Sequence, residues 1–147
     1  MKKNTPVSEI MTRHVTTITP NTTVAQIKVF FDKNNFHHLP VIDEGKLVGI
    51  VSKMDIFKVT SSFALFRSKE DQDFNDRIMK SVLAEEIMSP QVVVLSPNDT
   101  VVEAAALFSK NKYHALPVVE DRKFVGILTT YDLLEYAYHD VMLPILM

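Results

Sequence analysis

The sequence predicts an α+β chain built from two copies of one βαββα unit. The segment GIVSKMD at 49–55 returns as GILTTYD at 126–132, and aligning residues 9–55 with 86–132 needs no gap and gives 20 identical pairs. Within each copy, short β-branched runs alternate with stretches whose apolar residues recur at helical spacing. A repeat of this length indicates a duplicated structural unit.

The same order of elements is predicted in both copies. In the second copy, residues 91–95 are a predicted strand, and residues 96–112 are a predicted helix because Val101, Ala104 and Phe108 recur at helical spacing. Asn98 or Asp99 is expected to cap this helix. A β-hairpin and a second helix follow at 116–129 and from Thr129 onward. The first copy repeats these elements at 14–18, 19–35, 39–52 and from Ser52 onward.

Composition excludes several classes of protein. The chain has 147 residues, of which 46% are hydrophobic and 23% charged, which is typical of a soluble globular protein. Its net charge of −2 gives no basic excess with which to hold nucleic acid. It contains no cysteine, and no apolar run is long enough to span a membrane. Its beginning lacks the apolar stretch of a secretory signal, so a cytoplasmic location is expected.

The repeats set the expected domain boundaries. The first repeat is predicted at 7–59 and the second at 84–138, joined by a connector at 60–83 whose second half is helical. The helical second half of the connector is expected to have one apolar face. The first half of the connector and the apolar tail 141–147 are expected to cover the core or to contact another protein. The expected face consists of Phe74, Ile78 and Val82, with Met79 and Leu83, and the apolar residues of the first half are Phe63, Leu65 and Phe66.

Four motifs occur in the same order in both copies. They are IM, S/T-P-x-x-T-V, H-x-L-P-V and G-h-h-S/T-x-x-D, where h is an apolar residue. Together they resemble the paired cystathionine-β-synthase (CBS) domain family over about residues 7–138. The resemblance implies that the two repeats pack sheet to sheet with pseudo-twofold symmetry and form a homodimer. It also implies a regulatory role and adenine nucleotides or adenosyl compounds bound in the clefts between repeats.

The S/T-x-x-D motif independently suits a nucleoside. An ionised aspartate only accepts hydrogen bonds, so Asp55 and Asp132 match the neighbouring 2′ and 3′ hydroxyl donors of ribose. A phosphate would lie beside Ser52 or Thr129 and the helix N-terminus, where the helix dipole favours negative charge. The alternative is a capping box, in which hydroxyl and carboxylate only close their own helix.

The neighbours of this motif have expected roles as well. The resemblance places adenine against the backbone at Thr16 to Ile18 and its counterpart, and Lys53 follows the hydroxyl in the first copy, where the second copy has Thr130. The two ligand sites are therefore expected to differ. Gly49 and Gly126 either let a backbone approach the base or sugar, or serve only the packing of a nearby helix.

Three histidines stand at the entrance to the hairpins. His37 and His114 are repeat equivalents, and His38 follows the first of them. The resemblance implies that they face the ligand's phosphates, and packing or surface exposure is the alternative. A zinc site is disfavoured because adjacent strand residues point to opposite faces and no cysteine is available. His14 and His139 are expected to be surface residues.

No enzymatic motif is found. The three glycines cannot supply a Walker loop, and neither G-x-S-x-G nor H-E-x-x-H occurs.

Two hypotheses about the function remain. The first is a stand-alone regulatory protein that binds AMP, ADP, ATP or an adenosyl compound and signals to a partner. The second is a dimeric interaction module that binds no ligand.

Overall fold

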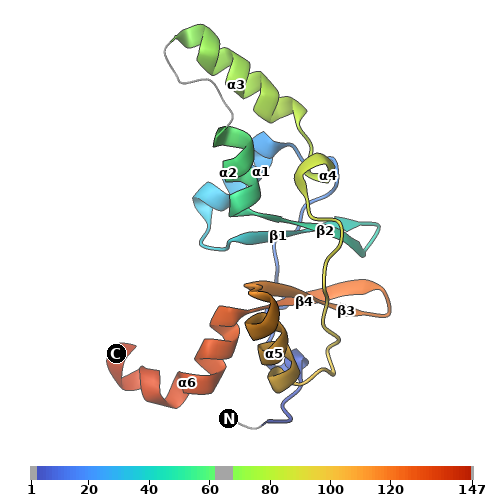
Figure 1. The fold of residues 1–147 in the computed structure, drawn as a ribbon, viewed down its shortest axis with the longest axis vertical. Helices are drawn as coiled ribbons and strands as arrows, with labels where there is room; N and C mark the ends of the chain where they lie inside the picture. Colours follow the sequence, from blue (N-terminus) through green and yellow to red (C-terminus); the bar gives the residue numbers. More distant parts are fainter. Residues whose placement is uncertain (1–2, 62–67, 147) are drawn as a thin grey trace. The chain divides into compact units, whose positions relative to one another are not determined.

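The computed structural model describes residues 3–61 and 68–146 and divides the chain into two compact units (Figure 1). The middle unit is Thr16–Gln91. The terminal unit combines Met1–Val15 with Val92–Met147. The sequence repeats and the compact units therefore do not coincide: the first residues of each repeat belong to the unit formed mainly by the other repeat.

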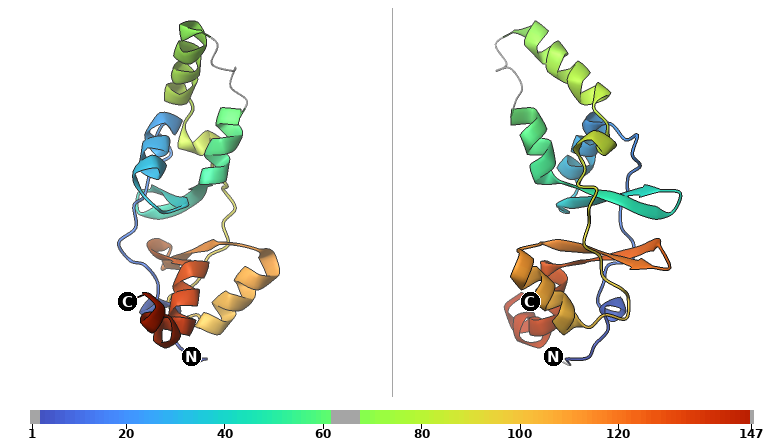
Figure 2. Two further views of the ribbon diagram at one scale, coloured as in Figure 1. Left: turned by 90° about the vertical axis from the view of Figure 1, so that its left-hand side faces the viewer. Right: turned by 45° about the vertical axis from the view of Figure 1, so that its right-hand side comes forward.

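Each unit contains a two-stranded antiparallel hairpin whose helices lie on one of its faces (Figure 2). The predicted α+β class and both hairpins are confirmed. The elements of the middle unit are α1 (Val24–Lys33), β1 (His38–Asp43), β2 (Lys46–Ser52), α2 (Lys53–Ser61), α3 (Lys69–Ser81) and α4 (Ala84–Ile87). Those of the terminal unit are η1 (Val7–Glu9), α5 (Val101–Asn111), β3 (Ala115–Glu120), β4 (Lys123–Thr129) and α6 (Thr130–Leu146).

The first predicted strand of each repeat is reduced to a single bridge. Ile18 pairs in parallel with Val41, and Leu95 pairs in the same way with Val118. The predicted strands at 14–18 and 91–95 are therefore wrong in extent. The reason is that both segments cross the boundary between the units, after Val15 and after Gln91, so only their last residue lies against a hairpin.

The exchanged segments are held by equivalent backbone hydrogen bonds in the two units. In the middle unit, the N–H of Val24 donates to the carbonyl of Val82 (2.9 Å), and the N–H of Ala84 donates to that of Thr22 (2.8 Å). In the terminal unit, the same bonds join Val101 to Thr5 (2.9 Å) and Val7 to Asp99 (2.7 Å). The duplication is thus preserved in three dimensions. The first residues of each repeat, 7–15 and 84–91, which we call the lead-in segments, complete the unit that contains the other repeat's hairpin.

Helices α1 and α5 begin at capping boxes. The hydroxyls of Thr23 and Thr100 accept the N–H groups of Gln26 and Glu103, whose side chains accept the threonine N–H groups in return. Thr100 is therefore the cap of α5, and neither Asn98 nor Asp99 is. The backbone N–H of Thr100, and then its hydroxyl, donate to the Glu103 carboxylate and hold its pKa below the usual value.

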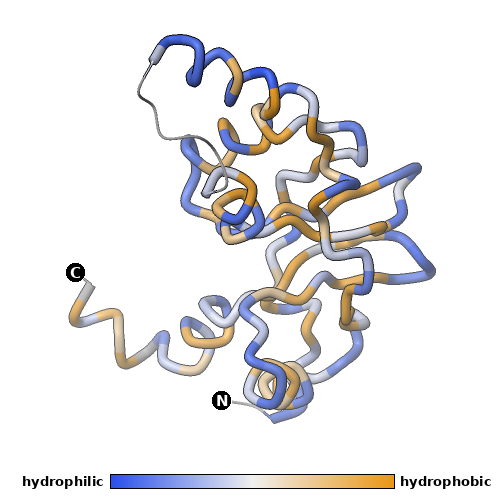
Figure 3. The backbone as a smooth tube through the Cα atoms, turned by 45° about the horizontal axis from the view of Figure 1, so that its top comes forward, coloured by the Kyte–Doolittle hydropathy of each residue, from blue (hydrophilic) through white to orange (hydrophobic). Residues whose placement is uncertain are grey.

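Each unit has its own apolar core. Figure 3 shows the hydrophobic stretches of the chain in orange. The middle core contains Ile18, Val24, Ile27, Phe31, Leu39, Val41, Val51, Ile56 and Ala84. The terminal core contains Val7, Met11, Leu95, Ala104, Phe108, Leu116, Val118 and Leu128. In each unit the exchanged segment contributes to the core, through Ala84 in the middle unit and through Val7 and Met11 in the terminal unit.

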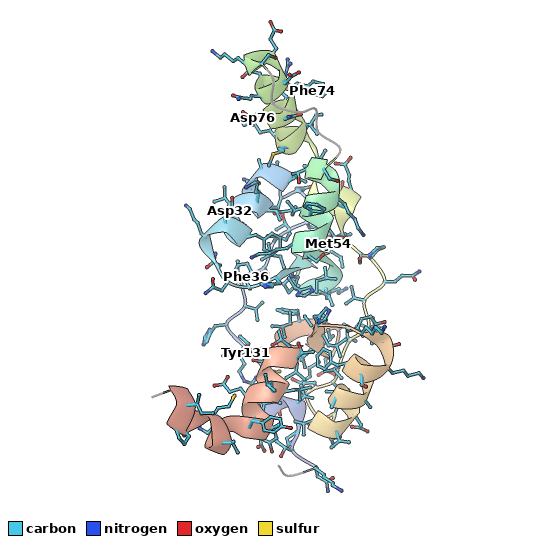
Figure 4. The ribbon with its side chains drawn as sticks, turned by 60° about the vertical axis from the view of Figure 1, so that its left-hand side comes forward. Asp32, Phe36, Met54, Phe74, Asp76 and Tyr131 are labelled. Carbon is cyan, nitrogen blue, oxygen red and sulfur yellow. The ribbon has the colours of Figure 1, made fainter. Side chains whose placement is uncertain are left out.

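The connector is helical where the sequence predicts it, but its inner face differs from the prediction. Helix α3 packs against α1 with Asn75 buried and Met79 and Val82 against the middle core. Phe74, expected on this face, is instead exposed, as Figure 4 shows. Asn75, Met79 and Val82 follow one another at spacings of four and three residues, so they lie on one face of the helix. Phe74 lies one position away from this face. The predicted segment with Phe63, Leu65 and Phe66 lies outside the described residues.

The two hairpins close through two-residue turns in which both residues have positive φ. The middle turn contains Glu44 (φ 49°) and Gly45 (φ 81°), and the terminal turn contains Asp121 (φ 49°) and Arg122 (φ 67°). Glycine adopts this region without the steric cost that an L side chain meets.

We therefore expect Arg122→Gly to stabilise the protein by about 1 kcal/mol, because it removes a side chain from a left-handed position. Gly45→Arg should destabilise it by a similar amount. Urea denaturation followed by circular dichroism checks both variants. An unchanged midpoint for Arg122→Gly would show that the arginine is not strained in this turn.

Candidate functional site

The S/T-x-x-D motif forms the same hydrogen-bonded box at the end of each hairpin. In the middle unit, Oδ2 of Asp55 accepts the N–H of Ser52 (2.7 Å) and its hydroxyl (3.0 Å), and the Ser52 hydroxyl accepts the N–H of Asp55 (3.2 Å). In the terminal unit, Asp132 and Thr129 make the same three bonds at 2.7, 2.7 and 3.2 Å. The capping alternative is therefore geometrically satisfied in both copies.

The cap occupies only half of each carboxylate. Both bonds that each carboxylate accepts end on Oδ2, and within the described part of the chain Oδ1 of Asp55 and of Asp132 accepts no hydrogen bond. Both aspartates are half-buried at the amino end of a helix, where the helix dipole stabilises their negative charge. Each unit thus retains a fixed acceptor oxygen that can receive a hydroxyl donor from a ligand.

The histidine segment is tied to the same helix end. The carbonyl of His37 accepts the N–H of Lys53 (3.0 Å), and the carbonyl of His114 accepts that of Thr130 (3.1 Å). Both histidines are exposed, as is Lys53. His38 is half-buried and lies opposite Ser52 in the hairpin register. The structure therefore brings the four predicted residue types of the middle unit, hydroxyl, carboxylate, lysine and histidine, to one end of its hairpin.

The first turn of α2 has fewer available N–H groups than the sequence suggests. The N–H of Lys53 bonds to the carbonyl of His37, and the N–H of Asp55 bonds to the Ser52 hydroxyl. Among the described residues this leaves the N–H of Met54 in that turn for an anion. The exposed side chain of Lys53 is then the main positive group beside it.

The segment expected to contact adenine runs beside the first hairpin strand. Ile18 donates to the carbonyl of Pro40 (3.0 Å) and accepts the N–H of Ile42 (2.8 Å), which places Thr16, exposed, at the start of this segment. Leu95 bonds to Pro117 and Val119 in the same way, at 2.9 Å each. Each unit therefore contains by itself the backbone segment, the hydroxyl and the carboxylate that the sequence associates with one ligand.

The two motif glycines lie under the exchanged lead-in segments. A Cβ on Gly49 would stand 2.4 Å from Sδ of Met88, and a Cβ on Gly126 would stand 2.7 Å from the carbonyl oxygen of Thr12. Since Ser89 pairs with Ile50 and Thr12 with Ile127, these segments form a further bridge along β2 and β4. The glycines therefore serve packing, against the lead-in segment and not against a helix as expected.

The described residues contain neither a metal-binding cluster nor a membrane-spanning helix. Over 3–61 and 68–146, no group of three or more histidine, cysteine, aspartate or glutamate side chains is arranged to hold a metal ion. In the same ranges, no helix has the length and apolar character needed to cross a membrane.

Sequence reasoning missed the exchange of the lead-in segments. The EIM motif at 9–11 and 86–88 lies near the start of each repeat, and its methionine lies beside the glycine of the other repeat's hairpin. Met11 and Gly49 are separated by the same number of residues as Met88 and Gly126. This equal spacing does not reveal whether each methionine contacts the glycine of its own repeat or of the other.

A family model described as CBS domain matches the chain twice, over residues 7–62 and 84–139. Among curated proteins, the uncharacterised protein MJ1225 of Methanocaldococcus jannaschii is 33% identical over 135 residues, which cover 91% of this chain and 48% of that protein. A CBS domain-containing protein of Dictyostelium discoideum is 31% identical over 131 residues, 88% of each protein. The chain thus spans about half of MJ1225 and most of the second relative.

Three solved structures share the fold. MJ1225 superposes with a TM-score of 0.80 at 32% identity, covering 93% of this chain and 49% of that one. CBSX2, crystallised with AMP, gives a TM-score of 0.76 at 26% identity over 92% of this chain and 98% of that one. The CBS domain pair of MJ0100, crystallised with 5′-methylthioadenosine and S-adenosyl-L-methionine, gives 0.74 at 29% identity over 92% and 98%.

Proposed function

The chain belongs to the CBS domain family and carries two CBS domains, and from this premise we propose that it is a non-catalytic regulatory protein that binds an adenosine-containing ligand and signals to a partner. The observation that carries the proposal is the half-used carboxylate present in both units. The Oδ1 atoms of Asp55 and Asp132 are held in place by the cap, and each can accept a ribose hydroxyl. Structural relatives crystallised with AMP and with adenosyl compounds support this class of ligand.

The two units differ in the charge they offer a phosphate. Lys53 stands beside the Ser52 hydroxyl in the middle unit, whereas Thr130 takes its place beside Thr129 in the terminal unit, and Ala115 replaces His38. We therefore propose that the middle unit binds phosphate-bearing ligands more tightly than the terminal unit does. The terminal unit suits a monophosphate or an adenosyl compound without phosphate.

A thermal-shift panel of AMP, ADP, ATP, NAD and S-adenosylmethionine tests the proposal. A ligand present at about 100 times its dissociation constant should raise the stability of the protein by roughly 2.7 kcal/mol. Guanosine monophosphate serves as the control for a nucleotide with a different base. If no member of the panel shifts the melting temperature beyond this control, the chain is better described as an interaction module without a ligand.

The histidines predict a pH dependence for phosphate-bearing ligands. If His37 and His38 in the middle unit and His114 in the terminal unit face the phosphates, protonation adds positive charge near an anion, so affinity for AMP should rise as pH falls from about 8 to about 6. Adenosine, which has no phosphate, should show no such rise. Calorimetric titration at several pH values checks this, and an affinity for AMP as flat as that for adenosine would contradict the assignment.

We also propose that the protein is a homodimer. Helices α2 and α6 present large side chains to solvent at equivalent positions. Met54 and its counterpart Tyr131 are 59% and 70% exposed (Figure 4). Phe57 and its counterpart Leu134 are 63% and 50% exposed. Large side chains at equivalent positions in both units, exposed in a single chain, favour burial against a second molecule.

A further inference from the structure

An open apolar groove of about 660 Å³ lies between α5 and α6 in the terminal unit. Ala105 and Phe108 form one wall, Leu133 and Ala137 form the other, and Leu134 and Tyr138 belong to its rim. Small residues on both walls allow the backbone of a further helix or strand to approach closely. The groove is thus shaped to receive an apolar segment, and at one end its lining includes His114 and Thr130.

The duplicated unit provides an internal comparison, because α1 and α2 repeat α5 and α6. The counterparts of Ala105 and Ser109 are Lys28 and Asp32, which form a salt bridge of 2.6 Å on the exposed surface of α1. The counterparts of Ala137 and Tyr138 are Thr60 and Ser61. At these four positions the middle unit carries more polar side chains than the terminal unit, so small or apolar residues there are not a requirement of the fold.

Helix α6 continues beyond the groove. It runs from Thr130 to Leu146, whereas the last residue of the groove lining is Tyr138. We call residues 139–146 the C-terminal arm. Its Val141 and Ile145 are 65% and 80% exposed, and its end is hydrophobic and runs away from α5 (Figures 1 and 3).

The arm does not lie in the groove of its own chain. Residues 130–138 of α6 form one wall of that groove, no described residue of the arm lines it, and the arm, which contains Pro144, runs away from α5 (Figure 1). We propose that the C-terminal arm of one copy docks in the α5–α6 groove of a second copy, reciprocally about a twofold axis. This inference rests on the proposed homodimer and specifies its contact.

The available area is sufficient for such a dimer. At their exposed fractions, the rim and arm side chains present roughly 500 Å² per copy, so reciprocal docking buries about 1,000 Å², the lower bound for a specific interface. These side chains are Leu134, Tyr138, Val141, Leu143 and Ile145. The floor of the groove adds to this area.

Two variants and one control test the docking by sedimentation of the full chain. The arm variant, Ile145→Glu, places a charge on the arm. The groove variant combines Ala105→Lys with Ser109→Asp, which are the side chains that α1 carries at the equivalent positions in the folded middle unit. Each should weaken the dimer at least tenfold. Val102→Glu, on α5 outside the groove and 42% exposed, should leave it unchanged. Circular dichroism confirms that each variant is folded.

Mixing the two variants provides the decisive measurement. The arm variant keeps an intact groove and the groove variant keeps an intact arm, so an equimolar mixture should regain one arm–groove contact and form heterodimers that neither variant forms alone. If the wild type and both variants are all dimers of equal stability, the docking is wrong but the homodimer stands. A wild-type monomer would overturn both, and the thermal-shift panel tests ligand binding independently of either result.

Discussion

Replacing Asp55 and Asp132 with asparagine should lower the affinity for AMP by roughly 10- to 100-fold per site, the value of a hydrogen bond to a charged group. The asparagine oxygen can still accept the N–H and hydroxyl of Ser52 or Thr129, so the helix cap is retained. The second position of the side chain changes from an acceptor oxygen to an NH₂ donor, which cannot receive a ribose hydroxyl. Calorimetric titration of the single and double variants with AMP measures the effect.

The single variants also assign the sites. If the phosphate is held mainly beside Lys53, Asp55→Asn should remove the tighter AMP site and Asp132→Asn the weaker one. The thermal melting of the proteins without ligand serves as the control, because retention of the cap predicts a change of less than about 1 kcal/mol. Full AMP affinity in the double variant would show that the carboxylates only cap their helices.

Replacing Gly126 with alanine should destabilise the protein by about 1–3 kcal/mol, the usual cost of inserting a methyl group into a packed site. The new Cβ would lie 2.7 Å from the carbonyl oxygen of Thr12, a backbone atom that can move only if the whole lead-in segment moves. That segment is also held by the pairing of Thr12 with Ile127. The midpoint of urea denaturation, at constant slope, measures the loss.

The equivalent change in the middle unit is a matched control. In Gly49→Ala the shortest contact is with the flexible side chain of Met88, at 2.4 Å, and the Ser89 carbonyl is farther, at 3.1 Å. Shortening Met88 to alanine should therefore relieve part of the cost of Gly49→Ala, which a double-mutant cycle detects. Shortening Met11 should relieve less of the cost of Gly126→Ala. Equal relief in both units would contradict the role of the Thr12 carbonyl.

The local elements of the fold were predictable because their signals lie within short stretches of sequence. Residues 116–129 alternate two apolar runs around a polar turn, and the structure places β3 and β4 there. Helices α1 and α5 end at Lys33 and Asn111, within two residues of the ends of the predicted helices at 35 and 112. Duplication doubled each of these signals, so a feature weak in one copy was supported by the other.

Features that depend on contacts between segments far apart in the sequence were not predictable. The run at 91–95 is β-branched and reads as a strand, yet Val93 and Val94 remain exposed because the chain passes there from one unit to the other. Likewise, helical spacing identified α3 but not its orientation, since the inward turn of Asn75 depends on its contact with α1. Tertiary contacts override local pattern at both positions.

The sequence predicted which residues form the candidate site, but it did not predict which hydrogen bonds their carboxylates make. The sequence identified Asp55 and Asp132 but left open whether they cap a helix or bind a ligand. In the structure the cap uses Oδ2, and among the described residues Oδ1 accepts no hydrogen bond, so the proposed ligand contact would use the other oxygen of the same carboxylate. No spacing rule distinguishes these oxygens.

Calorimetric titration of the wild-type protein with AMP and with its 2′,3′-dideoxy analogue measures the proposed contact most directly. Removing both ribose hydroxyls leaves the base and phosphate unchanged and deletes the only donors that the free carboxylate oxygens would receive. We predict measurable binding of AMP and at least tenfold weaker binding of the analogue. Equal affinities for the two nucleotides, or no binding of either adenosine compound, would contradict the claim that these aspartates recognise a nucleoside.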